Sequence, residues 1–90
     1  PQFLWLALQG NVRAETYIGV MYAQESWVTK DYQQASKWYK KAANKGYKIA
    51  QHNLGTNYDS GKGVSKDYKE AVKWYRKAAN QGYSKSQYNL

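Results

Sequence analysis

Few residues of this chain have the chemistry that catalysis or metal binding needs. The 90 residues include one histidine, His52, and no cysteine. A thiolate nucleophile, a disulfide framework and a cysteine-rich zinc site are therefore excluded, and one histidine cannot supply a two- or three-histidine metal centre. Only distant carboxylates such as Asp59 are available to activate His52 as a base. We therefore expect no catalytic residue, metal or cofactor, and we interpret His52 as a polar residue lining a groove.

Positive charge is the second chemical feature of the sequence. Lys and Arg number 14 against 6 Asp and Glu, which gives a formal net charge of +8. A basic face is predicted from Lys37, Lys41, Lys69, Lys73 and Lys77. Such a face can bind nucleic acid, anionic lipid, lipopolysaccharide or an acidic protein. Because lysine predominates over arginine and the aromatic residues are needed for packing, we disfavour nucleic acid, and a solvated face that keeps the protein soluble is favoured over a binding site.

An internal repeat indicates the elements that position these residues. Shifting the chain by 36 residues aligns Gly10 with Gly46 and Gly82, and aligns residues 37–39 with residues 73–75. The expected units are the end of a preceding repeat at 1–9, a first repeat at 10–45, a second at 46–81 and a truncated third at 82–90. We therefore expect one small domain that is a piece of a longer protein.

Each repeat is predicted to contain two helices. In the second helix of the unit, apolar residues between 68 and 79 recur at steps of three and four, which is typical of one apolar helix face. Asp67 and Glu70 match a capping box at its start, and a glycine of the 36-residue series ends it. In the first helix, Gly19 and Gly55 share one position. Because a mid-helix glycine costs about 1 kcal/mol relative to alanine, we expect a Trp or Tyr ring beside each.

These residues form a motif that resembles a known repeat family. The pattern is A-x-x-N-L-G-x-x-Y, then G-x-G-V, then D-Y-x-x-A-x-K-W-Y-x-K-A-A-x-x-G. It is carried by Ala50, Asn53, Leu54, Gly55, Tyr58, Gly61, Gly63, Val64 and residues 67–82. It resembles the Sel-one-like repeat, a relative of the tetratricopeptide repeat. The resemblance implies an all-α, right-handed solenoid of antiparallel helix pairs, here about two and a half repeats, that serves as a scaffold or adaptor binding other proteins.

The resemblance also implies where a partner would bind. In related solenoids the first helices line a concave groove, and the positions not used for packing point into it. Those positions here are Arg13, Thr16, Val20, Ala23, Gln24, Ile49, His52, Thr56, Asp59, Ser60, Lys85 and Tyr88. The other interpretation, an ordinary solvated helix surface, stays open. Some tetratricopeptide domains bind a C-terminal carboxylate through Lys and Asn in this groove, but the corresponding places hold Thr and Val, so that clamp is not encoded.

The loop of the first repeat departs from the motif. Gly61 and Gly63 of the second repeat are replaced by Glu25 and Trp27 in the first. If the two glycines adopt positive φ, the first loop must differ in conformation. Trp27 is then either an exposed binding anchor or a ring that folds onto neighbouring tyrosines, and packing is favoured because large rings are usually covered.

The partners and location follow from the same resemblance. Members of the family often work in bacterial envelope, secretion or virulence systems and in eukaryotic membrane-protein degradation, so a periplasmic, envelope or secreted location is favoured. We expect the ligand to be another protein or peptide, with any membrane association made through that partner. Because the ends of a short solenoid expose apolar faces, we also expect the chain to self-associate.

Overall fold

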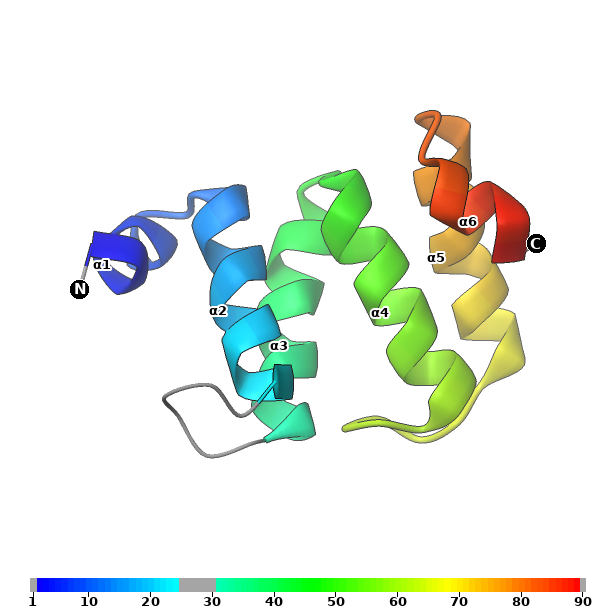
Figure 1. The fold of residues 1–90 in the computed structure, drawn as a ribbon, viewed down its shortest axis with the longest axis horizontal. Helices are drawn as coiled ribbons and strands as arrows, with labels where there is room; N and C mark the ends of the chain where they lie inside the picture. The colour runs from blue at the N-terminus through cyan, green and yellow to red at the C-terminus, as the bar shows by residue number, and fades with distance from the viewer. Residues whose placement is uncertain (1, 25–30, 90) are drawn as a thin grey trace.

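The computed structural model describes residues 2–24 and 31–89, and these residues form six α-helices with no strand. The helices are α1 (Gln2–Leu8), α2 (Val12–Gln24), α3 (Tyr32–Asn44), α4 (Lys48–Ser60), α5 (Tyr68–Asn80) and α6 (Ser84–Asn89). Figure 1 shows them following one another along the long axis of the molecule, with the two termini at opposite ends. Helices α2 and α3 pack as one pair and α4 and α5 as the next. The predicted all-α repeat solenoid is confirmed.

Both second helices begin at an aspartate, but only half of the predicted capping box forms. Asp31 and Asp67 accept hydrogen bonds from backbone N–H groups in the first turns of α3 and α5. The N–H of Asp31 donates to the carbonyl of Tyr22 at 2.9 Å, and that of Asp67 donates to Tyr58 at 3.0 Å. Because the carbonyls of the preceding helices already accept from these N–H groups, the N–H of Asp67 is not available to the side chain of Glu70.

The predicted contact between glycine and an aromatic ring is confirmed in both repeats. A Cβ on Gly19 would lie 2.6 Å from the ring of Tyr39, and one on Gly55 would lie 2.8 Å from the ring of Tyr75. Both tyrosines are 4% exposed. The rest of the core is rich in alanine; its fully buried members include Ala35, Ala42, Ala50, Ala78 and Leu54. Small residues and large rings therefore replace the usual aliphatic interior.

The second repeat is fixed to the first by a loop that covers the start of α3. The hydroxyl of Ser36 donates to the carbonyl of Lys62 at 3.1 Å and accepts from the side-chain amide of Asn57 at 2.8 Å. Gly63 has φ +75°, and a Cβ there would overlap the carbonyl of Tyr32. Only glycine therefore fits at this position. Its counterpart Trp27 lies outside the described residues, as do all of residues 25–30, so the proposed roles of Trp27 stay predictions.

Candidate functional site

The structure places the predicted groove residues in three different environments. All of them come from the first helices α2, α4 and α6, as expected. Arg13, Gln24, Ser60 and Lys85 are exposed, while Val20, Ala23, Ile49, Thr56 and Asp59 are half-buried. Thr16 and His52 are buried, at 5% and 8% exposure. Tyr88 belongs to α6, but its side chain lies outside the described part of the structure.

His52 is mostly enclosed, at 8% exposure, although it also lines a pocket with Ser84, Lys85 and Asn89; its role in partner binding stays a prediction. Its Nδ1 atom lies 2.7 Å from the hydroxyl oxygen of Ser86, and its ring centroid lies 5.1 Å from that of Tyr83 and 5.5 Å from that of Tyr75. His52 therefore joins α4 to α6, because its position on the helix faces the next first helix along the solenoid. Burial, and then the positive charge of Lys85, lower the pKa of His52.

Thr16 occupies the equivalent position in α2 and is enclosed in the same way. Its hydroxyl donates to the carbonyl of Val12, one turn earlier in the same helix, at 2.8 Å. This bond satisfies the buried hydroxyl without any outside partner. Thr16 is therefore enclosed and hydrogen-bonded within its own helix, and its role in partner binding stays a prediction.

The exposed face of α2 differs by one residue from the predicted groove positions. Tyr17, which is 44% exposed, stands where Thr16 was expected. Arg13, Tyr17, Val20 and Gln24 follow one another at steps of four, three and four residues, so they share one face of the helix. Helical spacing from Arg13 is compatible with either Thr16 or Tyr17, so the sequence does not distinguish the two.

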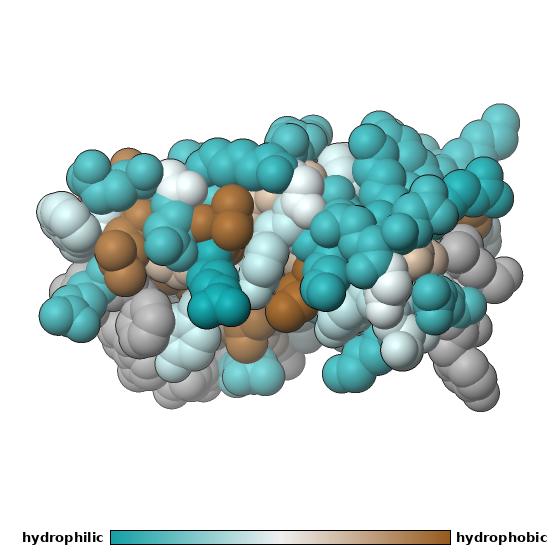
Figure 2. Space-filling model, turned by 90° about the horizontal axis from the view of Figure 1, so that it is seen from above, coloured by the Kyte–Doolittle hydropathy of each residue, from teal (hydrophilic) through white to brown (hydrophobic). Residues whose placement is uncertain are grey.

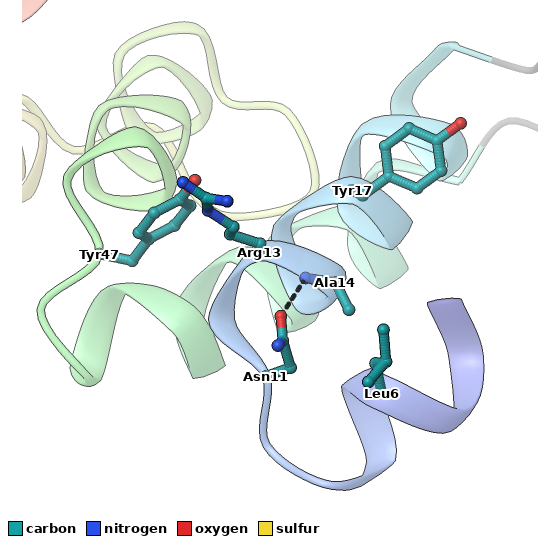
Figure 3. Close-up of a pocket in the computed structure, with 6 residues that line it drawn as sticks. All are labelled: Leu6, Asn11, Arg13, Ala14, Tyr17 and Tyr47. Atoms are coloured by element: carbon teal, nitrogen blue, oxygen red, sulfur yellow. Dashed lines mark hydrogen bonds between the residues drawn. The ribbon is translucent and has the colours of Figure 1, made fainter. Parts of the chain in front are cut away.

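A pocket lies at the N-terminal end of this surface, where α1, α2 and the turn before α4 meet. It has a volume of about 460 Å³ and is lined by Leu6, Asn11, Arg13, Ala14, Tyr17 and Tyr47. Figure 3 shows Arg13 reaching from α2 toward Tyr47, while Tyr17 projects on the other side of Ala14, above Leu6 of α1. The side-chain oxygen of Asn11 accepts from the N–H of Ala14 at 2.9 Å and so caps α2. The pocket therefore combines one cation with apolar and aromatic walls.

Apolar surface is concentrated toward the same end of the molecule. In Figure 2, brown side chains gather over the half that holds α1 and α2, whereas the half that holds α5 and α6 is mostly teal. Leu4 and Leu8 of α1 are 43% and 67% exposed. The region around the pocket is thus the less polar end of the surface seen from this side.

The lysines of the predicted basic face are exposed, but several of them cover aromatic rings. Lys37, Lys41, Lys69, Lys73 and Lys77 are all exposed on α3 and α5. The ammonium of Lys41 lies 5.1 Å from the ring centroid of Trp38, and those of Lys73 and Lys77 lie 5.0 and 5.4 Å from that of Trp74. These are cation–π contacts that shield large rings of the second helices. They give the lysines a packing role that requires no ligand.

The described part of the chain offers neither a metal site nor a membrane-spanning helix. Within residues 2–24 and 31–89, no group of three or more acidic, histidine or cysteine side chains is placed to hold a metal ion. No helix in the same residues is long and apolar enough to span a bilayer. The pocket beside Arg13 and the first-helix surface around it form the candidate site.

The comparisons with known proteins agree with the fold and the repeat. The Sel1 repeat profile matches residues 12–47 and 48–83, two residues later in register than the units expected above. A crystal structure of a Sel1 repeat protein from Oxalobacter formigenes is similar with 46% identity and a TM-score of 0.88, covering 90% of this chain and 33% of that one. A comparison with curated proteins found no match.

Two further solved structures from bacteria are similar. One is c5321, a protective antigen present in uropathogenic Escherichia coli strains that displays an SLR fold, with 48% identity, a TM-score of 0.93, and coverage of 94% of this chain and 18% of that one. The other is cysteine rich protein B of Helicobacter pylori, with 28% identity, a TM-score of 0.89, and coverage of 98% and 68%. The chain thus spans a third or less of the first two proteins.

Proposed function

The chain belongs to the Sel1 repeat family, whose members are generally protein-interaction modules, and from this premise we propose that it binds a partner protein through its first-helix face. We define this face as the surface formed by Arg13, Tyr17, Val20 and Gln24 of α2 and by Ile49, Asn53, Thr56 and Ser60 of α4. The fold is a helical scaffold that is not typically catalytic, so the proposed role is to hold a partner and to carry out no reaction.

The observation that supports this face is the pocket beside Arg13. A binding surface usually has an aromatic or arginine anchor in a partly desolvated hollow, surrounded by polar groups. Arg13 and Tyr17 provide both anchor types at one hollow, and Tyr17 keeps 44% of its surface exposed. On α3 and α5 the largest rings are instead covered by lysines, so the basic face offers fewer accessible anchors and is not the site we propose.

Site-specific cross-linking tests this proposal. A photo-reactive phenylalanine analogue is introduced at Tyr17 or Asn53 on the first-helix face, and at Val72 of α5, which is 39% exposed, as a matched control. We expect cross-links to one and the same partner protein from positions 17 and 53, and none from position 72. Cross-links from position 72 alone would place the binding surface on the second helices.

A charge variant separates this function from the alternative use of the basic face. Replacing Lys69, Lys73 and Lys77 with Glu removes positive charge from α5 alone. We expect capture of the partner protein to survive this change. If the protein recovers only nucleic acid or anionic lipid, and this recovery disappears in the triple variant, the protein is a polyanion binder instead. A bacterial envelope or secreted location stays a prediction.

A further inference from the structure

The residues that distinguish the pocket do not recur in the second repeat. Arg13 aligns with Ile49, Tyr17 with Asn53 and Asn11 with Tyr47. In a solenoid, the residues that hold the repeats together recur from unit to unit, as Gly19 and Gly55 do here. Exposed residues that change between units are free to serve recognition. The pocket is therefore the part of the first-helix face that can carry partner specificity.

Charge at the pocket is unbalanced. Arg13 is the single charged residue among the six that line it. Glu15, two residues away, points into the interior at 2% exposure and is held by Lys45 at 2.9 Å, so it does not face Arg13. Asp59 of α4 accepts from the hydroxyl of Tyr75 at 3.4 Å. Among the residues that the structure describes, the pocket therefore presents a guanidinium without a carboxylate beside it, in a molecule of net charge +8.

The lining divides into a cationic half and an apolar half. Arg13 reaches toward Tyr47 on one side, and Leu6, Ala14 and Tyr17 form the other (Figure 3). A guanidinium binds a carboxylate through two parallel hydrogen bonds, and the apolar half matches an aromatic or aliphatic side chain. We propose, resting on the function proposed above, that the pocket binds an internal segment of a partner protein in which an Asp or Glu stands next to an apolar side chain.

The carboxylate we infer belongs to a side chain and not to a chain terminus. A terminal carboxylate is held either by a cluster of backbone N–H groups or by the Lys and Asn clamp of some tetratricopeptide domains, which this sequence lacks. The N-terminus of α2 lies at this pocket, but the N–H of Ala14 is already bonded to the side chain of Asn11 at 2.9 Å. Arg13, the charged donor among the lining residues, is therefore the principal recognition group that we infer for the anion.

Selection from a random peptide library tests the inference. The peptides are displayed with both ends blocked by the carrier, and the probe is the full 90-residue chain. We expect enrichment of peptides with Asp or Glu beside Phe, Tyr, Leu or Met. Selected sequences are resynthesised with acetylated and amidated ends, and their affinities are measured by calorimetry. Arg13→Gln should weaken binding by about ten- to hundredfold, because one charge-assisted hydrogen-bonded pair is lost.

Matched variants show whether the effect belongs to this pocket. Tyr17→Ala should also weaken binding by roughly tenfold or more, and Val72→Ala, at an exposed position of α5 outside the first-helix face, should change it less than twofold. Circular dichroism confirms that each variant is folded. A peptide in which Gln replaces the selected Asp or Glu should lose as much affinity as Arg13→Gln does, with no further loss when the two changes are combined.

Several results would overturn the inference. These are no enrichment, enrichment of peptides without an acidic residue, binding that needs a free C-terminal carboxylate, and affinities that Arg13→Gln leaves unchanged. Each can occur while cross-linking from positions 17 and 53 still captures a partner, in which case the first-helix face binds by other contacts. Failure of the cross-linking itself would instead remove the proposed function.

Discussion

The two repeats make the same structural link with different chemistry. In the first, the ammonium of Lys45 meets the buried carboxylate of Glu15 at 2.9 Å. In the second, the equivalent residues are Gln81 and Gln51, and their side-chain amides meet at the same distance of 2.9 Å. Equivalent backbone positions therefore carry a charged pair in the first repeat and an uncharged pair in the second.

The same side chains also join successive turns of the solenoid. Lys45 donates to the carbonyl of Gly10 at 3.1 Å, and Gln81 donates to that of Gly46 at 2.9 Å. Each bond joins residues that are 35 positions apart. It connects the turn after the second helix of a repeat to the turn before the first helix of the same repeat. These bonds are the polar counterpart of the repeated alanine and tyrosine core.

The two versions differ in how completely their buried atoms are satisfied. The amide of Gln51 also donates to the carbonyl of Ala43 at 3.3 Å. Glu15 has an oxygen at the corresponding place, and that Oε1 atom is buried without a hydrogen-bond partner among the described residues. Burying a polar atom without a hydrogen bond lowers the stability of the fold. We therefore infer that the Gln51–Gln81 pair suits this site better than the Glu15–Lys45 pair. Glu15 should also depend on Lys45 more strongly than Gln51 depends on Gln81.

Removal of the partner should therefore have the largest effect in the first repeat. Lys45→Ala should lower the free energy of unfolding by about 2–3 kcal/mol, because it leaves the Glu15 carboxylate buried and unpaired. Gln81→Ala should cost only about 1 kcal/mol, because a neutral amide is left behind. Urea unfolding followed by circular dichroism measures both. Equal losses would show that burial of charge does not distinguish the two repeats.

Conversion of the first repeat to the amide version should have a smaller effect of opposite sign. Glu15→Gln should raise the free energy of unfolding by about 1 kcal/mol. The new amide can donate to the carbonyl of Ala7, the counterpart of Ala43, while its oxygen still accepts from Lys45. The reverse change, Gln51→Glu, is the matched control and should destabilise. A loss of stability in Glu15→Gln would mean that the ion pair itself stabilises the fold.

The pH dependence of stability should come from the second repeat. The pKa of His52 is lowered by burial and by Lys85, whereas the equivalent Thr16 does not titrate. Because the unfolded chain binds a proton on His52 at the ordinary pKa of 6.5 and the folded chain only at lower pH, the stabilising effect is present above pH 6.5 and is lost as the pH falls through the lower folded value.

A variant that copies the first repeat isolates this effect. His52→Thr should unfold with a weaker dependence on pH than the natural sequence between about pH 8 and about pH 5. Thermal unfolding across this range measures the difference. Parallel pH profiles for the two proteins would show that protonation of His52 does not oppose the packing of α6 on α4.

Salt should produce the smallest difference between the repeats. The ammonium end of the Lys45–Glu15 pair has 44% of its side chain exposed, so added salt screens it in part. Raising the salt concentration from about 0.1 M to about 1 M should lower the stability of the natural protein relative to the Glu15→Gln, Lys45→Gln double variant by under about 1 kcal/mol. An equal salt response in both proteins would indicate that the pair acts mainly through its hydrogen bonds.

Features that depend on local periodicity were predictable from the sequence. The 36-residue repeat indicated the helix pairs, and the shared position of Gly19 and Gly55 indicated an aromatic ring beside each glycine. The first-helix face was predicted less well, because steps of three and four residues from Arg13 lead equally to Thr16 or to Tyr17. A one-residue error rotates the predicted face by about 100°, since a helix has 3.6 residues per turn.

The amino-acid sequence by itself determined the family, the helical repeat and the close packing of tyrosine on glycine, because these follow from spacing within a unit. Only the tertiary structure decided that His52 bonds Ser86 across two helices, that Lys45 neutralises Glu15, and that Leu6, Arg13 and Tyr47 share one pocket. Those contacts join residues from different units. Their existence depends on the angle and register at which helices stack, and no periodicity within one unit specifies either.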